Sequence, residues 1–137
     1  MGSKETDARI RIDKMLLESG WKLPGWHKDK EINVKTEIKN EHGEADYVLL
    51  NSKGFFICTV EAKNSSKSPL VGKEKSREYA QSLRSRFIIL SNGIKHYLWD
   101  TKLGNPHLID RLPTQKYLEL RGESFNPPRD EDEDVND

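Results

Sequence analysis

Two acidic residues and a lysine stand at the ends of two apolar runs in the middle of the chain. Asp46 opens a run that ends at residue 50, and Glu61-Ala62-Lys63 closes a run that starts at residue 55. Successive side chains of a strand point to opposite faces, so Glu61 and Lys63 point the same way while Ala62 turns inward. Two carboxylates on neighbouring strands can share a divalent cation such as Mg²⁺, and a nearby lysine can orient or deprotonate an attacking water. These residue types at this spacing are suited to cutting a phosphodiester.

An acidic residue two positions before a lysine is a weak signal by itself. The chain is 34% charged and contains this triplet three times, at 37–39, 61–63 and 100–102. Only the triplet at 61–63 ends a long apolar run that follows another run carrying an acid. The alternative is a solvated strand end whose charges form an ion pair, which is the usual state of such surface charges.

Helices and strands are expected to alternate around these residues. Apolar residues recur with a helical repeat before Gly20, and they alternate singly around Val34, which predicts a helix and then a strand with one buried face. The polar segment 51–54 is suited to a hairpin turn, so the strands that carry Asp46 and Glu61 should be neighbours. In chain order the expected elements are helix 5–19, strands 32–38, 46–50 and 55–63, helix 69–84, strands 87–90 and 94–99, and a short helix 114–120. This order predicts an α/β fold with a mixed central sheet flanked by helices.

The helix expected at 69–84 has an apolar and a basic side. Val71, Tyr79, Ala80 and Leu83 should face the core, and Lys73, Lys75, Arg77, Arg84 and Arg86 lie on or near the other side. A basic face could follow a DNA backbone. The alternative is a solvated face, because glutamates interleave with the bases. Trp21 and Trp26, in the loop after the first helix, are expected to pack at the edge of the core.

Length and charge fit one domain followed by a tail. A chain of 137 residues is long enough for a single core, which we expect in residues 1–121, with 122–137 as a disordered acidic tail or linker. The formal net charge is zero, but the last eight residues hold six of the 23 acids and no base. The rest therefore carries 23 bases and 17 acids, a net charge of +6 that favours a phosphate-bearing partner.

Several other kinds of protein are disfavoured. Cys58 is the only cysteine and lies in an apolar run, so it forms no disulfide within the chain and suits a reducing cytosol. The four histidines lack zinc-ligand spacing, and Gly72-Lys73 lacks the upstream glycine of a phosphate loop, so no ATP site is expected here. No apolar run approaches the roughly 18 residues of a membrane-spanning helix, and no secretory signal is present. We therefore expect a cytoplasmic protein that does not bind membranes.

Short blocks of the sequence resemble, in order, a known family. They lie at 9–13 with Leu16 and Gly20-Trp21, then at 43–49, 60–63, 79–80, 90–93 and 97–100. Over roughly residues 5–121, these blocks look like the N-terminal nuclease domain of the restriction (R, or HsdR) subunit of type I restriction-modification enzymes. That family belongs to the PD-(D/E)xK nucleases. The resemblance implies a restriction-endonuclease-like core and a metal-dependent endonuclease that hydrolyses DNA.

The resemblance also implies roles for individual residues. The catalytic acids and lysine of the family correspond to Asp46, Glu61 and Lys63. Mg²⁺ or Mn²⁺ would be held by Asp46, Glu61 and the backbone carbonyl of Ala62, and Lys63 would position the water that attacks the phosphodiester. A helical glutamate that assists the metal in many relatives corresponds to Glu5.

The chain departs from the family at two positions. The family usually has a glutamine four residues before the helix tyrosine, where it helps to hold DNA, and the matching residues here are Lys75 and Tyr79. A lysine could still meet a phosphate as a point charge. Lys73 and Arg77, on the same helix, are further candidates for DNA contact. The motif also begins with Ala45-Asp46 in place of Pro-Asp, which is common in this branch.

Type I R subunits carry an ATP-driven helicase motor after the nuclease domain, and this chain has none. The expected partners are DNA and, in a complete enzyme, that motor with the modification and specificity subunits. Two alternatives stay open from the sequence. The chain could be an inactive DNA-binding or assembly module with the same fold, or a structure-specific nuclease of another branch, such as a junction resolvase.

Overall fold

Six strands form one sheet in the same order as they follow along the chain. They are β1 (Val34–Asn40), β2 (Gly43–Leu50), β3 (Phe56–Ala62), β4 (Phe87–Ser91), β5 (His96–Asp100) and β6 (His107–Ile109). All neighbours are antiparallel except β3 and β4, which are parallel and are joined by a crossover through α2 (Lys73–Ser82). This computed structural model describes residues 4–125, and the side chains of residues 6–122.

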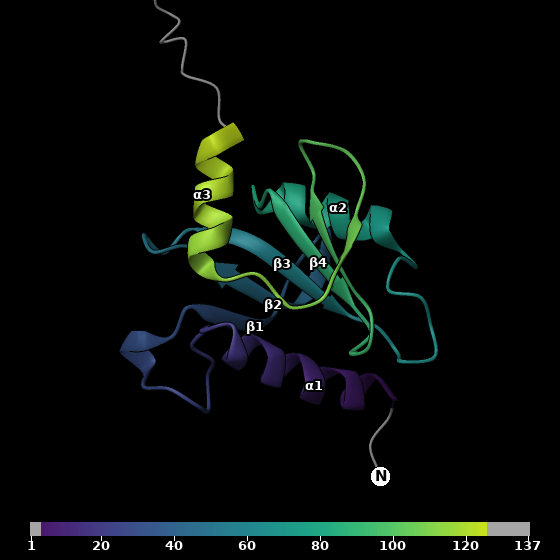
Figure 1. The fold of residues 1–137 in the computed structure, drawn as a ribbon, viewed down its shortest axis with the longest axis horizontal. Coiled ribbons are helices and arrows are strands. Elements are labelled where there is room, and N and C mark those ends of the chain that lie inside the picture. Colours follow the sequence, from purple (N-terminus) through teal and green to yellow (C-terminus); the bar gives the residue numbers. More distant parts are fainter. Residues whose placement is uncertain (1–3, 126–137) are drawn as a thin grey trace, which may run out of the picture.

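Helices cover both faces of the sheet (Figure 1). Helix α1 (Lys4–Glu18) packs on one face through Ile12 and Leu16, and α3 (Gln115–Phe125) reaches the same core through Leu118. Helix α2 covers the opposite face through Tyr79 and Ala80. Every residue of β4 is buried, because this central strand has a helix layer on each side. The predicted α/β fold with a mixed central sheet is therefore confirmed. Within residues 4–125, no helix combines the length and apolar character needed to cross a bilayer.

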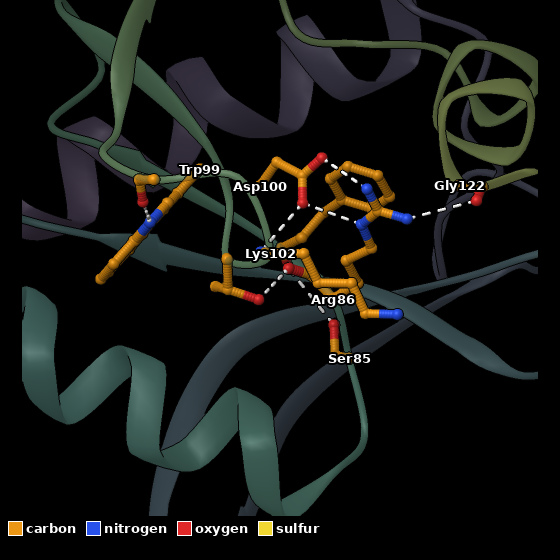
Figure 2. A network of polar contacts seen from close by, with 9 residues as sticks. Ser85, Arg86, Trp99, Asp100, Lys102 and Gly122 are labelled. Carbon is orange, nitrogen blue, oxygen red and sulfur yellow. Dashed lines mark hydrogen bonds and ion pairs between the residues drawn. The ribbon is translucent and has the colours of Figure 1, made fainter. Parts of the chain in front are cut away.

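A part-buried ion pair links α3 to the start of β4 and the end of β5 (Figure 2). Arg86 donates to both carboxylate oxygens of Asp100, from Nε at 2.8 Å and from Nη2 at 2.9 Å. Its Nη1 also donates to the carbonyl oxygen of Gly122 at 3.2 Å. The sequence pattern places Arg86 near the basic face of α2, and that prediction is wrong. Bidentate pairing in a part-buried site gives this arginine a structural partner in place of a DNA phosphate.

Several expected details differ from the structure. Val71 is 52% exposed, because α2 begins only at Lys73, after a left-handed Gly72, and not near residue 69. Trp26 is 64% exposed, whereas Trp21 is buried as expected. In β1 only Val34 is fully buried, because β1 is an edge strand and no helix covers most of it.

The C-terminal part of the domain also extends beyond the prediction. Strand β6 is not among the expected elements, because it is only three residues long with two exposed side chains, which gives no alternating signal. Helix α3 continues to Phe125, past the end of the helix expected at 114–120. The remainder of the expected acidic tail, residues 126–137, lies outside the described residues.

Candidate active site

Strands β2 and β3 separate at the residues singled out in the sequence. Their pairing runs from Leu50 with Phe56 to Tyr47 with Val60 and then stops. Beyond this point β2 stays paired with β1 as far as Gly43, and β3 stays paired with β4 as far as Ala62. The two strands therefore fork, and Asp46 and Glu61 are the first residues past the last pair.

The Asp46 carboxylate closes the base of this fork. Its Oδ2 accepts the backbone N–H of Ala62 at 2.7 Å, so the side chain takes the place of the missing strand partner. The N–H and C=O of one strand residue point to the same edge, so the carbonyl oxygen of Ala62 also lies on the side of Asp46. The Ala62 side chain is buried in the core on the α1 face. This confirms the predicted alternation, with Glu61 and Lys63 on the opposite face.

An open cleft of about 660 Å³ lies over the fork. It is lined by Glu37, Lys39, Glu44, Ala45, Asp46, Glu61, Ala62, Lys63, Asn64 and Lys67. A second hollow of about 560 Å³ shares Glu61 and Lys63 with the cleft and extends to Lys75 at the start of α2. The structure thus brings the three predicted catalytic side chains, Asp46, Glu61 and Lys63, into one solvent-accessible site.

Lys63 lies between the end of β4 and the start of α2. The Lys63 N–H donates to the carbonyl oxygen of Ser91 at 2.8 Å, which continues the parallel ladder one residue past β3. Its Nζ lies 3.5 Å from the position that a Cβ on Gly72 would occupy. This is an ordinary van der Waals distance, so the φ of +77° and not a lack of space is what favours glycine at position 72.

An arginine from α1, Arg9, lies beside the carboxylates of Glu37 and Asp46. Arg9 Nη1 is 2.9 Å from Glu37 Oε2 and 3.9 Å from Asp46 Oδ1. The guanidinium lies 5.2 Å from the centre of the Tyr47 ring, and the Tyr47 hydroxyl donates to Asp13 at 2.6 Å. Burial opposes the charge on Arg9, but hydrogen bonds to Glu37 and Tyr47 outweigh it and raise the pKa of Arg9. Arg9 therefore stays charged beside Glu37 and Asp46.

Glu37 has a strained backbone opposite Asp46. In the β1–β2 ladder the pairs on either side are Thr36 with Tyr47 and Ile38 with Ala45, and no pair forms between them. Glu37 has a φ of +54°, which for a residue other than glycine costs on the order of 1–3 kcal/mol. This conformation places its carboxylate both against Arg9 and at the wall of the cleft. Strained residues of this kind cluster at functional sites.

The sequence does not assign roles to Arg9 or Glu37. Arg9 and Asp13 are four residues apart in a helix, so both lie on one face. This spacing is a sequence signal that the two side chains could pack together against the sheet. The positive φ of Glu37 has no such signal, because glutamate has no preference for that conformation.

The four predicted DNA-contact residues lie in three different environments. Lys75 lines the second hollow beside Glu61 and Lys63. Lys73 and Arg77 lie over the ring of Trp99, with the charged groups 4.7 and 5.5 Å from its centre, and both pair with Glu74. They are directed toward β5, away from the fork. Of these three basic residues, only Lys75 lines a hollow together with candidate catalytic groups.

Tyr79, the fourth residue, is buried under the site. Its side chain is 1% exposed, and its hydroxyl has no hydrogen-bond partner among the described residues. Burial, followed by the nearby charges of Glu61 and Glu44, raises the pKa of Tyr79, so its hydroxyl stays protonated. This position favours a supporting role beneath Glu61 over direct contact with DNA.

The donor set at the fork fits a hard cation. Asp46, Glu61 and the carbonyl oxygen of Ala62 are all oxygen ligands, and Mg²⁺ is commonly bound by one or two carboxylates with water in its other positions. Within the described part of the chain, no group of three or more His, Cys, Asp or Glu side chains is arranged to hold a metal ion. The backbone of Glu5 begins α1, but its side chain lies outside the description, so its predicted contribution stays a prediction.

Comparison with known proteins gives one informative likeness. No protein-family model matches the chain, and no curated protein matches it. The structure is similar to a solved fragment described as an HsdR subunit of a type I restriction enzyme from Vibrio vulnificus YJ016, with a TM-score of 0.73 and 26% sequence identity. The match covers 95% of this chain and 27% of the other. The chain thus has a fold similar to about a quarter of that restriction-enzyme fragment.

Proposed function

We propose that this chain is a metal-dependent DNA endonuclease domain of the type found in type I restriction enzymes. The observation that carries the proposal is the fork between β2 and β3, where Asp46, Glu61 and Lys63 meet in one open cleft. The likeness to an HsdR fragment supports a restriction-enzyme relationship for the same fold.

Each group at the fork has a chemical role in this proposal. Asp46, Glu61 and the Ala62 carbonyl would hold Mg²⁺ or Mn²⁺. The bound cation supplies Lewis-acid stabilisation of the charge that develops on the phosphate oxygens. Lys63, on the same face as Glu61, orients the attacking water and stabilises negative charge on the phosphate. Asp46 is held in place by the Ala62 N–H, so one metal ligand is oriented before the substrate arrives.

The distribution of charge over the cleft suits a cation together with a phosphate. Carboxylates and lysines 39, 63, 67 and 75 together line the cleft and the adjoining hollow. None of these four lysines forms an ion pair with another of the described side chains. Their charges are therefore available to a DNA backbone, where neutralising phosphates releases counterions and favours binding.

In a complete enzyme the domain would act with further components. By similarity, these would be an ATP-driven motor and the modification and specificity subunits that select the target. Recognition of a DNA sequence would then lie outside this chain.

A second candidate function is an inactive DNA-binding or assembly module with the same fold. The observation that favours it is Lys75, which lines the site where the family usually places a glutamine. Such a module would keep its affinity for DNA without cutting it.

Metal titration and cleavage together test the proposed function. By calorimetry with Mn²⁺, we expect binding by the parent chain and at least a tenfold loss of affinity, about 1.4 kcal/mol, in Asp46→Asn and Glu61→Gln. The amide introduced by Asp46→Asn keeps an oxygen that can accept the Ala62 N–H, so the fold should be preserved. The matched control, Asp110→Asn, changes an exposed acid outside the cleft and should bind like the parent.

Lys63→Ala separates the two candidate functions. The variant should still bind Mn²⁺, because Lys63 is not a ligand, but it should abolish DNA cleavage by the assembled enzyme. Equal metal binding by the parent chain and Asp46→Asn would contradict the metal site. Undiminished cleavage by Lys63→Ala would contradict the catalytic assignment, and no cleavage by the assembled parent enzyme would favour the inactive module.

A further inference from the structure

The turn that follows the candidate catalytic strand is held rigidly by hydrogen bonds within itself. Asn64 Oδ1 accepts the N–H of Ser66 at 2.9 Å and its hydroxyl at 2.8 Å. The N–H of Lys67 donates to the carbonyl oxygen of Asn64 at 2.9 Å. Residues 64–67 therefore form a closed turn that starts directly after Lys63. Its two ends, Asn64 and Lys67, both line the cleft.

A buried side chain from another part of the sheet holds this turn in place. Asn92, in the turn between β4 and β5, donates from Nδ2 to the carbonyl oxygen of Lys67 at 2.8 Å. Its Oδ1 accepts the N–H groups of Ile94 and Lys95 at 2.9 and 2.8 Å. Asn92 is only 6% exposed. The amide oxygen of Asn92 is thus hydrogen-bonded within the β4–β5 turn, and its amide nitrogen is hydrogen-bonded to Lys67 at the cleft.

The β4–β5 turn is itself fixed against α1. A Cβ on Gly93 would lie 3.0 Å from the Cα of Ala8, so the turn packs directly on the helix backbone. The N–H of Gly93 donates to the hydroxyl of Ser91 at 2.9 Å. Asn92 therefore holds Lys67 from a rigid base, and the position of the Lys67 backbone is set by the core of the domain.

We propose that Lys67 binds a backbone phosphate of DNA in the cleft and that Asn92 is the positioning residue that holds it there. This inference rests on the proposed DNA substrate. The Lys67 side chain is exposed, lines the same cleft as Asp46 and Lys63, and forms no ion pair with the described side chains. Lys67 lies four residues after Lys63. Its backbone is fixed by hydrogen bonds, while its exposed side chain can turn its ammonium group toward a ligand in the cleft. A phosphate beside the cleaved bond is the ligand suited to that arrangement.

DNA affinity measured as a function of salt tests the contact. Binding of a fluorescein-labelled duplex is followed by anisotropy without divalent metal, so that no cleavage occurs. Lys67→Ala should weaken binding severalfold and reduce the slope of log K against log salt by about 0.9, the value for one lost phosphate contact. Lys67→Arg should retain the slope. Lys116→Ala, the same charge change at an exposed residue of α3, should alter the slope much less.

A double-mutant cycle tests the role of Asn92. Asn92→Asp keeps the oxygen that accepts the Ile94 and Lys95 N–H groups but removes the N–H donor to Lys67. We expect Asn92→Asp to lose affinity, and Lys67→Ala to cause little further loss in that background. Asn92→Ser removes the same N–H donor without adding a charge. It should show the same non-additivity with Lys67→Ala, which separates the lost hydrogen bond from an attraction between a new carboxylate and the Lys67 ammonium. A purely structural role for Asn92 would lower the melting temperature without this non-additivity.

The outcomes separate this inference from the proposed function. Parent-like affinity and slope in Lys67→Ala, or no DNA binding by the parent chain, would overturn the phosphate contact. Full additivity of Asn92→Asp and Lys67→Ala would overturn the positioning role. The metal titration and the Lys63→Ala cleavage assay do not depend on Lys67, so they judge the proposed function separately.

Discussion

Two buried hydroxyl groups beneath the candidate site have no hydrogen-bond partner among the described residues. They are those of Tyr79 on α2 and Thr59 on β3, and each side chain is 1% exposed. Thr59 is two residues before Glu61 and faces the same side of the sheet. A buried donor without a partner costs roughly 1–3 kcal/mol. Natural domains tolerate few such groups, and both of these lie under the cleft.

Removing either hydroxyl should not destabilise the domain. For Tyr79→Phe and Thr59→Val we expect a free energy of unfolding, measured by urea denaturation, within about 1 kcal/mol of the parent value or above it. Tyr47→Phe is the matched control, because its hydroxyl donates to Asp13 and contacts the Arg9 carbonyl, and it should lose about 1–3 kcal/mol. A comparable loss in Tyr79→Phe would show that its hydroxyl is bonded, for example to water.

At the scale of single residues, the sequence predicts the groups whose placement follows from strand alternation. Asp46, Glu61 and Lys63 meet because a short hairpin fixes the register of β2 and β3. Arg9 and Glu37 could not be predicted in the same way. The first depends on how α1 packs on the sheet, and the second on a backbone conformation that glutamate rarely adopts.

At the scale of elements, two glycines with the same backbone conformation differ in their surroundings. Gly93 and Gly54 both have a φ of +87°. A Cβ on Gly54 would meet nothing within 4 Å, whereas one on Gly93 would lie 3.0 Å from the Ala8 Cα and 3.3 Å from the Arg11 Cδ. The β4–β5 turn therefore packs on α1 through the missing side chain of Gly93.

Replacing each of these two glycines with alanine measures how much the packing of the β4–β5 turn on α1 contributes to stability. Gly54→Ala should cost only the strain of a positive φ, on the order of 1 kcal/mol. Gly93→Ala should cost at least about 1 kcal/mol more, because it must also displace the helix backbone. The difference in free energy of unfolding between the two variants is the measured quantity. Equal losses would show that the turn does not press on α1.

The elements that the sequence predicts best are those whose own residues carry the signal. Helix α1 and the buried strand β4 are predicted almost to the residue, because their apolar patterns are strong. Val71 and Trp26 are misplaced because their exposure depends on where neighbouring segments lie. Apolar residue type alone does not give that information.

At the scale of the whole molecule, one histidine links stability to mild acid. His96 is 6% exposed, and its Nδ1 lies 2.7 Å from the hydroxyl oxygen of Ser91. Burial lowers the pKa of His96, so the folded domain holds it neutral while the unfolded chain binds a proton near pH 6.5. The stability that depends on neutral His96 is therefore complete above about pH 6.5 and is lost as the pH falls toward the folded pKa.

Unfolding measured between about pH 7 and pH 5 tests this linkage. The parent should lose stability across the window, and His96→Gln should show a shallower dependence. His107→Gln, an exposed imidazole on β6, should behave like the parent. Burial opposes ionisation of Asp100, but hydrogen bonds from Arg86 outweigh it and lower the pKa of Asp100, so its contribution is lost only at lower pH. The same slope in His96→Gln and the parent would rule out His96 as the source.

Under the proposed function, the fork between β2 and β3 makes DNA cleavage depend on the correct register of these two strands. If β3 slipped by one residue against β2, Ala62 would take the outward face, and the side chains of Glu61 and Lys63 would be driven into the core. The same slip would turn Cys58 and Val60 away from the core on the α1 face, so the misaligned domain would lose apolar burial together with the acid and lysine at the cleft. If the proposed function holds, only molecules with the native register would cut DNA, and a misaligned copy would leave DNA intact.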